Sequence, residues 1–382
     1  MSTAHNKRLL IFGAVYFLIY LAGAVIFYKE RIFLDGAYYF FHVVQSENFW
    51  VEHQRFILIA SQLLLLTGVK LHLTLQTLLL LNSVNPVLYL FFFFFICVII
   101  LKDEAAGWTL LFLGACGVYF LYFVPMYEVW YGAVLLVFFS SLLQRQFYRT
   151  PLQLAILCVI VLSLLFSYPL MIIGFVFFTC YHFLAQRRLP WKVAVLFILM
   201  VICWLTWKSL FISDYENGKV SYPFSRIGTT LRENFTPLSN IKSLILFLFT
   251  VYGEAMIMLL LTVSLLLYRR NYLKTALILG FTIGFILMIN ITHNFPWNHS
   301  NYFERMYLLL IPLCMLPFLR EVYHTSKQKL GLEMAFLLII IYRGVQIVQH
   351  SAPYSDRIVR VEQFVESAQG QDGSKFFVKG ED

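Results

Sequence analysis

The chain has 382 residues, of which 60% are hydrophobic, 18% aromatic and only 13% charged. Because a soluble domain is roughly a quarter charged, this composition excludes a soluble protein with one anchor and predicts an all-α protein that crosses a membrane many times. The net charge of +9 does not indicate a nucleic-acid partner, because the basic residues fall in short clusters between apolar segments. Membrane proteins show this pattern on their cytoplasmic side.

The first apolar segment, Leu9–Tyr28, predicts a spanning helix. It is long enough to cross a bilayer, and no small-residue cleavage site follows it, so it is not a signal peptide. Lys7 and Arg8 precede it, which predicts a cytoplasmic N-terminus and an outer loop over Lys29–Arg55. We therefore expect a multi-pass protein of the bacterial inner membrane.

The next apolar run, Phe56–Val69, decides the orientation of everything that follows. It has fourteen residues, and a span needs roughly 20, so we expect an interfacial helix on the outer face. Thr77–Leu101 then crosses. This topology places four later basic loops in the cytoplasm, whereas a crossing Phe56–Val69 would place all four outside, against the positive-inside bias. The loops contain Arg145 and Arg149; Arg187, Arg188 and Lys192; Arg269, Arg270 and Lys274; and Arg320, Lys327 and Lys329.

Nine further apolar segments bring the predicted spans to about eleven. They are Gly107–Val124, Trp130–Leu143, Pro151–Phe166, Pro169–Leu184, Trp191–Phe211, Ser243–Tyr268, Thr275–Ile291, Met306–Leu319 and Leu332–Val348. Residues 1–348 would then form one transmembrane domain. The polar tail, 349–382, is expected to lie outside as a small appendage or as disordered chain.

No cofactor is predicted. All six cysteines lie within apolar segments, which favours buried thiols over a disulfide framework or a metal site. His293 and His299 lie in the last outer loop, and two histidines without a nearby acid are weak evidence for a divalent metal.

Two acids on the outer side are candidate functional groups. Asp35 lies in the first loop, where a carboxylate can act as a general base towards a hydroxyl or amine; the alternative is a solvated loop acid. Glu128 lies in a turn rich in aromatic residues, and an acid at the edge of lipid is costly without a partner or a water-filled cavity. Glu254 lies within an apolar segment, which makes it a third candidate, but the sequence identifies no basic partner for it.

Basic and aromatic side chains accompany these acids. Arg305 stands at the outer boundary of a predicted span, where its planar fork would suit a lipid phosphate; the alternatives are pairing with Glu304 and snorkelling. His53 and Arg55 end the first loop, where they would line a polar cleft or cap the interfacial helix. Tyr38 lies just after Asp35.

This layout resembles the GT-C superfamily of membrane glycosyltransferases, which includes the protein O-mannosyltransferases and the lipid A aminoarabinose transferases. Members have an essential acid near the start of the first outer loop, and Asp35 in LDGAYYFF takes that position. Phe56–Val69 is similar to their interfacial helix, and Glu128 lies where some members have a second acid. Tyr302–Leu308, which contains Arg305, resembles their late arginine motif.

Two departures from the family pattern concern the donor and the domains. Many members carry paired acids in the first loop, whereas Asp35 has no neighbouring acid, and this leaves metal dependence and donor type open. The long soluble domain of some members is absent from this chain, unless the tail from Gln349 is its remnant.

The resemblance implies transfer of a sugar from a polyprenyl-phosphate donor to a lipid, glycan or protein acceptor on the outer face. Asp35 would deprotonate the acceptor, and the apolar spans would hold the isoprenoid chain. The expected substrate-binding residues are Arg305, Glu128, Arg55, His53 and Tyr38.

Two other functions stay open. A transporter or flippase for a lipid-linked sugar or small solute would need polar residues across the whole bilayer, often on broken helices of paired repeats. The sequence offers Glu254 and Pro86 for such a path, but we find no repeat. A non-catalytic scaffold is the third interpretation.

Overall fold

The computed structural model describes residues 3–186, 190–214, 217–218, 226–292, 300–323 and 329–368. Within these ranges every regular element is a helix, which confirms the all-α class. Six helices are long and apolar enough to cross a membrane, and one bent pair would make a seventh span. This confirms a multi-pass membrane protein, but the predicted count of about eleven spans is not confirmed, because several predicted spans are short helices.

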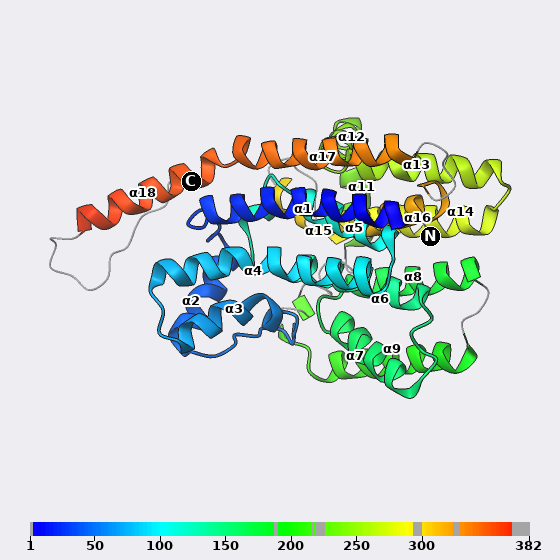
Figure 1. The fold of residues 1–382 in the computed structure, drawn as a ribbon, viewed down its shortest axis with the longest axis horizontal. Helices are drawn as coiled ribbons and strands as arrows, with labels where there is room; N and C mark the ends of the chain where they lie inside the picture. The colour runs from blue at the N-terminus through cyan, green and yellow to red at the C-terminus, as the bar shows by residue number, and fades with distance from the viewer. Residues whose placement is uncertain are drawn as a thin grey trace.

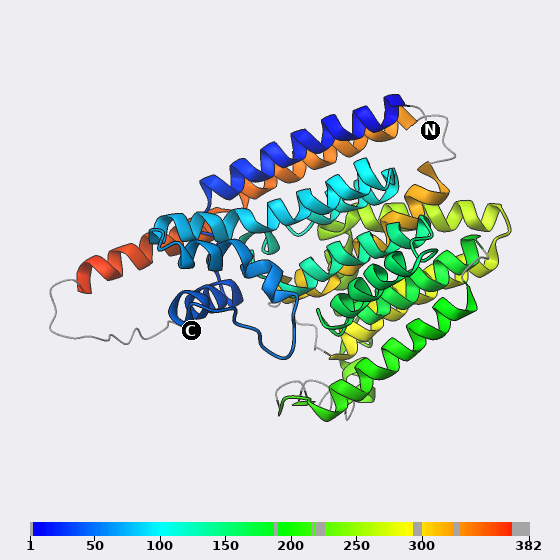
Figure 2. The same cartoon turned by 60° about the horizontal axis from the view of Figure 1, so that its bottom comes forward.

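The helices lie largely along one direction, with the first and the penultimate side by side (Figures 1 and 2). The long ones are α1 (Thr3–Ile26), α4 (Leu75–Phe95, extended by a π-helical turn, Ile96–Ile100), α9 (Trp191–Leu210), α14 (Tyr272–Thr292) and α17 (Lys329–Gln349). α15 (Ser300–Met306), a 3₁₀ turn (Tyr307–Leu309) and α16 (Leu310–Glu321) together form another. The shorter apolar helices are α6 (Glu128–Gln144), α7 (Pro151–Leu165) and α8 (Met171–Gln186).

The centre of the bundle is a packed apolar core. In the α15–α16 stretch, Tyr302–Glu321, 89% of the residues of the most apolar 18-residue window are buried, whereas the share in α9 is only 22%. Leu110, Leu136 and Leu313 are among the completely buried side chains of this core. A helix that is apolar on every side is stable either inside a bundle or against lipid. Its burial decides between the two, so the stretch of 302–321 is central and α9 is peripheral.

The prediction of one span over Gly107–Val124 is wrong. Helix α5 (Glu104–Ala115) ends early, and residues 116–127, with a 3₁₀ turn at Leu121–Phe123, run as a buried irregular segment. Gly117 begins the change of direction with a φ of +74°, a conformation that glycine adopts without the steric cost of a side chain. We call residues 116–127 the crossing segment.

The predicted span over Ser243–Tyr268 is a bent pair of helices, which makes one broken span or a re-entrant loop. α12 (Leu238–Val251) and α13 (Gly253–Tyr268) meet at a bend of 95°. Glu254 lies in the first turn of α13 and binds Arg343 through two contacts, Nε–Oε1 at 2.9 Å and Nη2–Oε2 at 2.7 Å. The basic partner that the sequence did not identify is therefore Arg343 of α17, and the bend brings Glu254 to it.

The described part of the tail is helix as far as Ala368, so of the two expectations it fits the small appendage. α18 (Ala352–Ala368) follows α17 and packs against the first loop. Lys29 Nζ lies 2.7 Å from Glu362 Oε1, and the ring of Tyr354 stacks on Phe123 at a centroid distance of 4.0 Å. The tail therefore lies at the same end of the bundle as the first loop.

Two helices lie between α1 and α4: α2 (Asp35–Ser46) belongs to the first loop, and α3 (Leu58–Lys70) occupies the predicted Phe56–Val69 helix. It packs antiparallel along the first half of α4. Asn85 Nδ2 donates to the carbonyls of Ala60 and Ser61, each at 3.0 Å, while Gly68 lies against Leu78 and Leu81. Its position along the membrane surface stays a prediction.

The described basic loops gather at one end of the bundle, with the start of α1. Arg8 Nε lies 2.6 Å from Glu333 Oε2 at the start of α17, and Arg145, Lys274 and Arg320 line one cavity. We call this the basic end. The opposite end, which holds Asp35, is the first-loop end. The positive-inside argument requires this separation of the basic loops from the first loop. Three basic residues of those loops, Arg187, Arg188 and Lys327, lie outside the described residues.

We predict that the first-loop end faces the outside of the cell. In a chain whose native cysteines are replaced by alanine, His72→Cys, in the exposed turn between α3 and α4, should react with a membrane-impermeant maleimide in intact cells. Arg149→Cys, exposed at the basic end, is the matched control and should react only after permeabilisation. Labelling of the Arg149→Cys variant alone in intact cells would reverse the topology.

Candidate functional site

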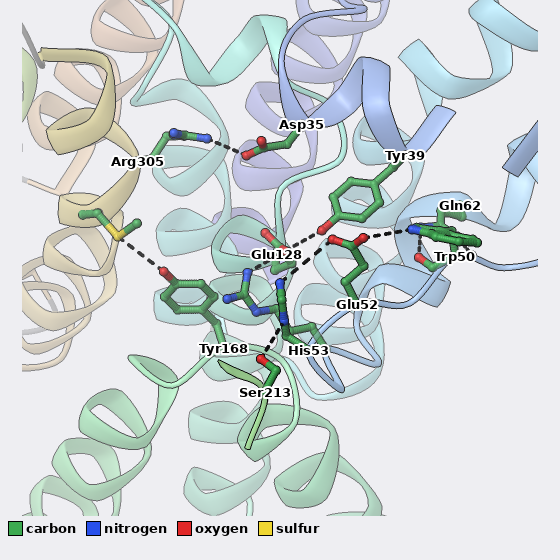
Figure 3. A network of polar contacts seen from close by, with 12 residues as sticks. Asp35, Tyr39, Trp50, Glu52, His53, Gln62, Glu128, Tyr168, Ser213 and Arg305 are labelled. Carbon is green, nitrogen blue, oxygen red and sulfur yellow. Dashed lines mark hydrogen bonds and ion pairs between the residues drawn. The ribbon is translucent and has the colours of Figure 1, made fainter. Parts of the chain in front are cut away.

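An acid and an arginine from opposite parts of the chain meet at the first-loop end. Asp35 Oδ2 accepts from Arg305 Nη1 at 2.8 Å, across 270 residues of sequence (Figure 3). The Asp35 side chain is 54% exposed, whereas that of Arg305 is only 15% exposed. Asp35 begins α2, where the helix dipole favours a carboxylate. The pair therefore presents an accessible acid beside a held guanidinium.

Aromatic rings of the crossing segment hold Arg305 in place. Its guanidinium carbon lies 5.2 Å from the ring centroid of Phe120 and 5.3 Å from that of Tyr127, distances typical of cation–π contacts. Its Nε has no hydrogen-bond partner among the described residues. The Asp35 contact and the two rings therefore fix the guanidinium at the first-loop end.

Glu304 does not pair with Arg305, although the sequence left that alternative open. Its carboxylate accepts from the backbone N–H groups of Phe120 at 3.1 Å and Leu121 at 3.4 Å, and its carbonyl accepts from Tyr252 Oη. Glu304 thus ties α15 to the crossing segment and to the α12–α13 bend. Successive side chains of a helix point about 100° apart, so the two neighbouring residues reach different groups of the crossing segment and the first loop.

Glu128 and Arg55 form a second ion pair. Arg55 Nη1 lies 3.0 Å from Glu128 Oε1, and the two side chains are only 12% and 4% exposed. Tyr39 Oη also donates to Glu128 Oε1 at 3.3 Å, and the Arg55 guanidinium carbon lies 4.8 Å from the ring centroid of Tyr168. Burial and the charge of Glu128 raise the pKa of Tyr39, so this phenol stays a neutral donor.

The two ion pairs are neighbours in the fold. Tyr39, which donates to Glu128, lies one helical turn after Asp35 on α2. Tyr127, which packs on Arg305, directly precedes Glu128. The structure thus brings four of the predicted site residues together, and Figure 3 shows the Asp35–Arg305 contact beside the contact of Tyr39 with Glu128.

His53 and Tyr38 hold the first loop instead of joining the ion pairs. Tyr38 Oη donates to Glu52 Oε1 at 2.5 Å, which raises the pKa of Tyr38, and Trp50 Nε1 donates to the same oxygen at 3.1 Å. His53 Nδ1 lies 3.1 Å from Ser213 Oγ, which follows α9. These contacts fix the loop that carries Arg55.

The turn before Arg55 has an unusual backbone. His53 and Gln54 have φ values of 51° and 58°, in the left-handed region that residues other than glycine seldom adopt. The end of α9 holds both of them: Lys208 Nζ donates to the His53 carbonyl and Gln54 Nε2 donates to the Phe211 carbonyl, each at 2.9 Å. Strain of this kind often accompanies functional sites.

Sequence reasoning missed four aromatic residues of this site: Phe120, Tyr127 and Tyr168 beside the two arginines, and Tyr39 beside Glu128. The sequence pointed to two of them only through their position next to a predicted site residue, since Tyr39 follows Tyr38 and Tyr127 precedes Glu128. Membrane-interface aromatics are common, so the residue types alone did not distinguish them.

A second polar feature lies at the basic end. It is a cavity of about 410 Å³ that is lined by both acidic and basic side chains. Arg320 Nη2 lies 3.5 Å from Asp103 Oδ2, and Lys274 Nζ lies 2.6 Å from Glu321 Oε1. The apolar core separates this cavity from the ion pairs at the first-loop end.

No group of three or more His, Cys, Asp or Glu side chains in the described part of the chain is placed to hold a metal ion. The histidines considered for a metal, His293 and His299, lie outside the described residues.

Comparison with protein-family models, with curated proteins and with solved structures found no match for this chain. The resemblance to the GT-C superfamily therefore rests on layout and short motifs.

We predict that Glu128→Gln lowers the free energy of unfolding by about 3–5 kcal/mol, because it leaves the Arg55 guanidinium buried without its carboxylate. Glu47→Gln, in the same loop, is the matched control: Glu47 and its partner Lys70 are both 54% exposed, and exposed pairs contribute little. Thermal unfolding of the purified variants in detergent measures both. Equal stability of the two variants would contradict the structural weight given to the Arg55–Glu128 pair.

Proposed function

We propose that the protein is a GT-C-type glycosyltransferase that moves a sugar from a polyprenyl-phosphate donor to an acceptor at the first-loop end. The observation that carries this proposal is the Asp35–Arg305 contact, in which an exposed acid lies 2.8 Å from a guanidinium that aromatic rings hold in place. Apolar helices surround this end and offer lipid-facing surfaces to an isoprenoid chain.

The proposed reaction is a single displacement at the anomeric carbon. Asp35 accepts the proton of the acceptor hydroxyl as its oxygen forms the new bond to that carbon. The bond between the anomeric carbon and the phosphate oxygen breaks, and its electron pair leaves with the polyprenyl phosphate. Arg305 stabilises the charge of this leaving group through its guanidinium. The sugar configuration inverts, and no cofactor is assigned.

The second ion pair would form a wall of the site. Arg55 and Glu128 neutralise each other, so they can shape a polar cleft without binding the donor phosphate themselves. Tyr39 offers a neutral phenol to a sugar hydroxyl only by giving up its bond to Glu128. Tyr38 and His53 would act by holding the loop. The acceptor class, whether lipid, glycan or protein, stays open in this proposal.

We propose the bacterial inner membrane as the location, with a cytoplasmic N-terminus. The described basic loops share one end with Arg8, which supports this orientation through the positive-inside bias. Acceptors would then meet the first-loop end on the extracytoplasmic side.

A transporter or flippase is the second candidate, and the 95° bend between α12 and α13 is the observation that favours it. Broken helices often form transport sites. However, Arg343 closes Glu254 in a two-contact ion pair and also donates to Gln346 Oε1 at 2.9 Å and to the Val251 carbonyl at 3.0 Å. This pair is better explained as a structural joint between α13 and α17, so we favour the enzyme.

We predict that Asp35→Asn lowers sugar transfer by roughly 10²–10⁴-fold, because asparagine keeps the size but cannot accept the acceptor proton. Transfer from a radiolabelled polyprenyl-phosphate sugar by the purified protein measures this. Glu47→Gln, an exposed acid of the same loop, should keep normal transfer. Near-normal transfer by a folded Asp35→Asn protein would remove Asp35 from the mechanism and shift attention to Glu128.

We predict that Arg305→Lys raises the KM for the donor and lowers kcat, and that Arg305→Ala does so more strongly, because lysine keeps the charge but loses the planar fork. The KM for the acceptor should change little. Glu254→Gln should mainly lower thermal stability. A transporter would give the reverse pattern: Arg305→Lys would keep normal uptake into vesicles, and Glu254→Gln would abolish uptake without loss of folding.

A further inference from the structure

Arg31 is a buried arginine in the turn between α1 and α2. The residue is only 3% exposed. Its guanidinium carbon lies 4.3 Å from the ring centroid of Tyr122 in the crossing segment. Its Nε and Nη1 have no hydrogen-bond partner among the described residues, and no carboxylate of those residues lies within ion-pair distance of it.

This environment differs from that of other arginines in the same chain. Four largely buried arginines each face a carboxylate within 3.5 Å. These pairs are Arg55–Glu128, Arg305–Asp35, Arg320–Asp103 and Arg343–Glu254. Burial of an isolated charge costs several kcal/mol, and arginine cannot lose its proton to avoid that cost. Arg31 has a side-chain contact with Tyr122 but no carboxylate beside it, so the described protein groups leave its charge without a counter-ion.

A small cavity lies beside Arg31. It has a volume of about 40 Å³, and its lining includes Arg31, Tyr16, Tyr20, Tyr122 and Trp130. The hydroxyls of Tyr20 and Tyr122 already donate to the carbonyls of Ala115 and Tyr20, at 3.4 and 3.0 Å. The Arg31 guanidinium is the charged group in the lining of this cavity.

The volume selects the kind of anion. One water needs roughly 10–15 Å³ of such space, so 40 Å³ holds only one to a few species of that size. Pockets for sugars or headgroups are roughly 300–1,000 Å³. A monatomic anion meets both the size and the charge, and we infer that Arg31 and this cavity bind a chloride ion.

The inferred chloride site and the candidate functional site are separate, but both contact the crossing segment. The crossing segment contacts Arg31 through Tyr122 and contacts Arg305 through Phe120 and Tyr127. A bound chloride would neutralise Arg31 and stabilise this segment. The inference does not depend on the proposed glycosyl transfer, because it concerns folding of the segment.

Thermal unfolding at constant ionic strength tests this inference. The purified protein in detergent is titrated from sodium gluconate into sodium chloride. We expect a saturable rise of about 5 °C in the Tm of the wild type, and bromide should replace chloride. Arg31→Gln should lose the halide dependence. Arg357→Gln is the matched control, because Arg357 lies at the same end but donates to the carbonyls of Glu30 and Ile32, and it should keep that dependence.

A second measurement covers the case in which Arg31→Gln does not fold. Crystals of the wild type grown in bromide should give an anomalous peak within hydrogen-bond distance of the Arg31 guanidinium. A wild type whose Tm is the same in gluconate and chloride would overturn the inference. So would an equal halide dependence in Arg31→Gln, or an anomalous map without a peak at Arg31, which would mean that waters alone solvate the guanidinium.

Discussion

A charge inside an apolar bundle needs an opposite charge beside it, and this constraint organises the structure. The pairs that meet it join distant parts of the chain: Arg305 with Asp35 across 270 residues, and Arg343 with Glu254 across 89. Each pair therefore acts as a long-range tie between helices as well as a local neutralisation. Because an unpaired buried charge is costly, the bundle has few alternative ways to pack these helices together.

The crossing segment is where these ties converge. Glu304 accepts its backbone N–H groups at Phe120 and Leu121, while Tyr122 stacks under Arg31 and Phe123 under Tyr354. A segment without regular structure leaves backbone groups unsatisfied unless side chains reach them. Here the side chains that reach its backbone, Glu304 and Tyr354, come from the C-terminal half of the chain, while Arg31 packs on the Tyr122 ring, so the segment connects the first loop to α15 and α18.

The same constraint separates the two candidate functions. An enzyme at one membrane face needs an exposed acid and a held cation at that face, and Asp35 with Arg305 has both properties. A transporter needs a polar path, but Glu254 is closed by Arg343 and apolar side chains fill the centre of the bundle. On this reasoning we propose chemistry at the first-loop end, where lipid-linked and aqueous groups would meet.

The sequence by itself determined the all-α, multi-pass class and the segregation of basic loops from the first loop, because hydropathy and charge are local properties of the chain. It also identified Asp35, Glu128, Arg55 and Arg305 as candidate site residues on the outer side of the membrane. Only the tertiary structure decided which charges pair, since a partner such as Arg343 lies too far away in sequence to be recognised. The end of α5 and the bend before Glu254 were decided there too, because contacts with distant helices outweighed the continuous hydropathy of those segments.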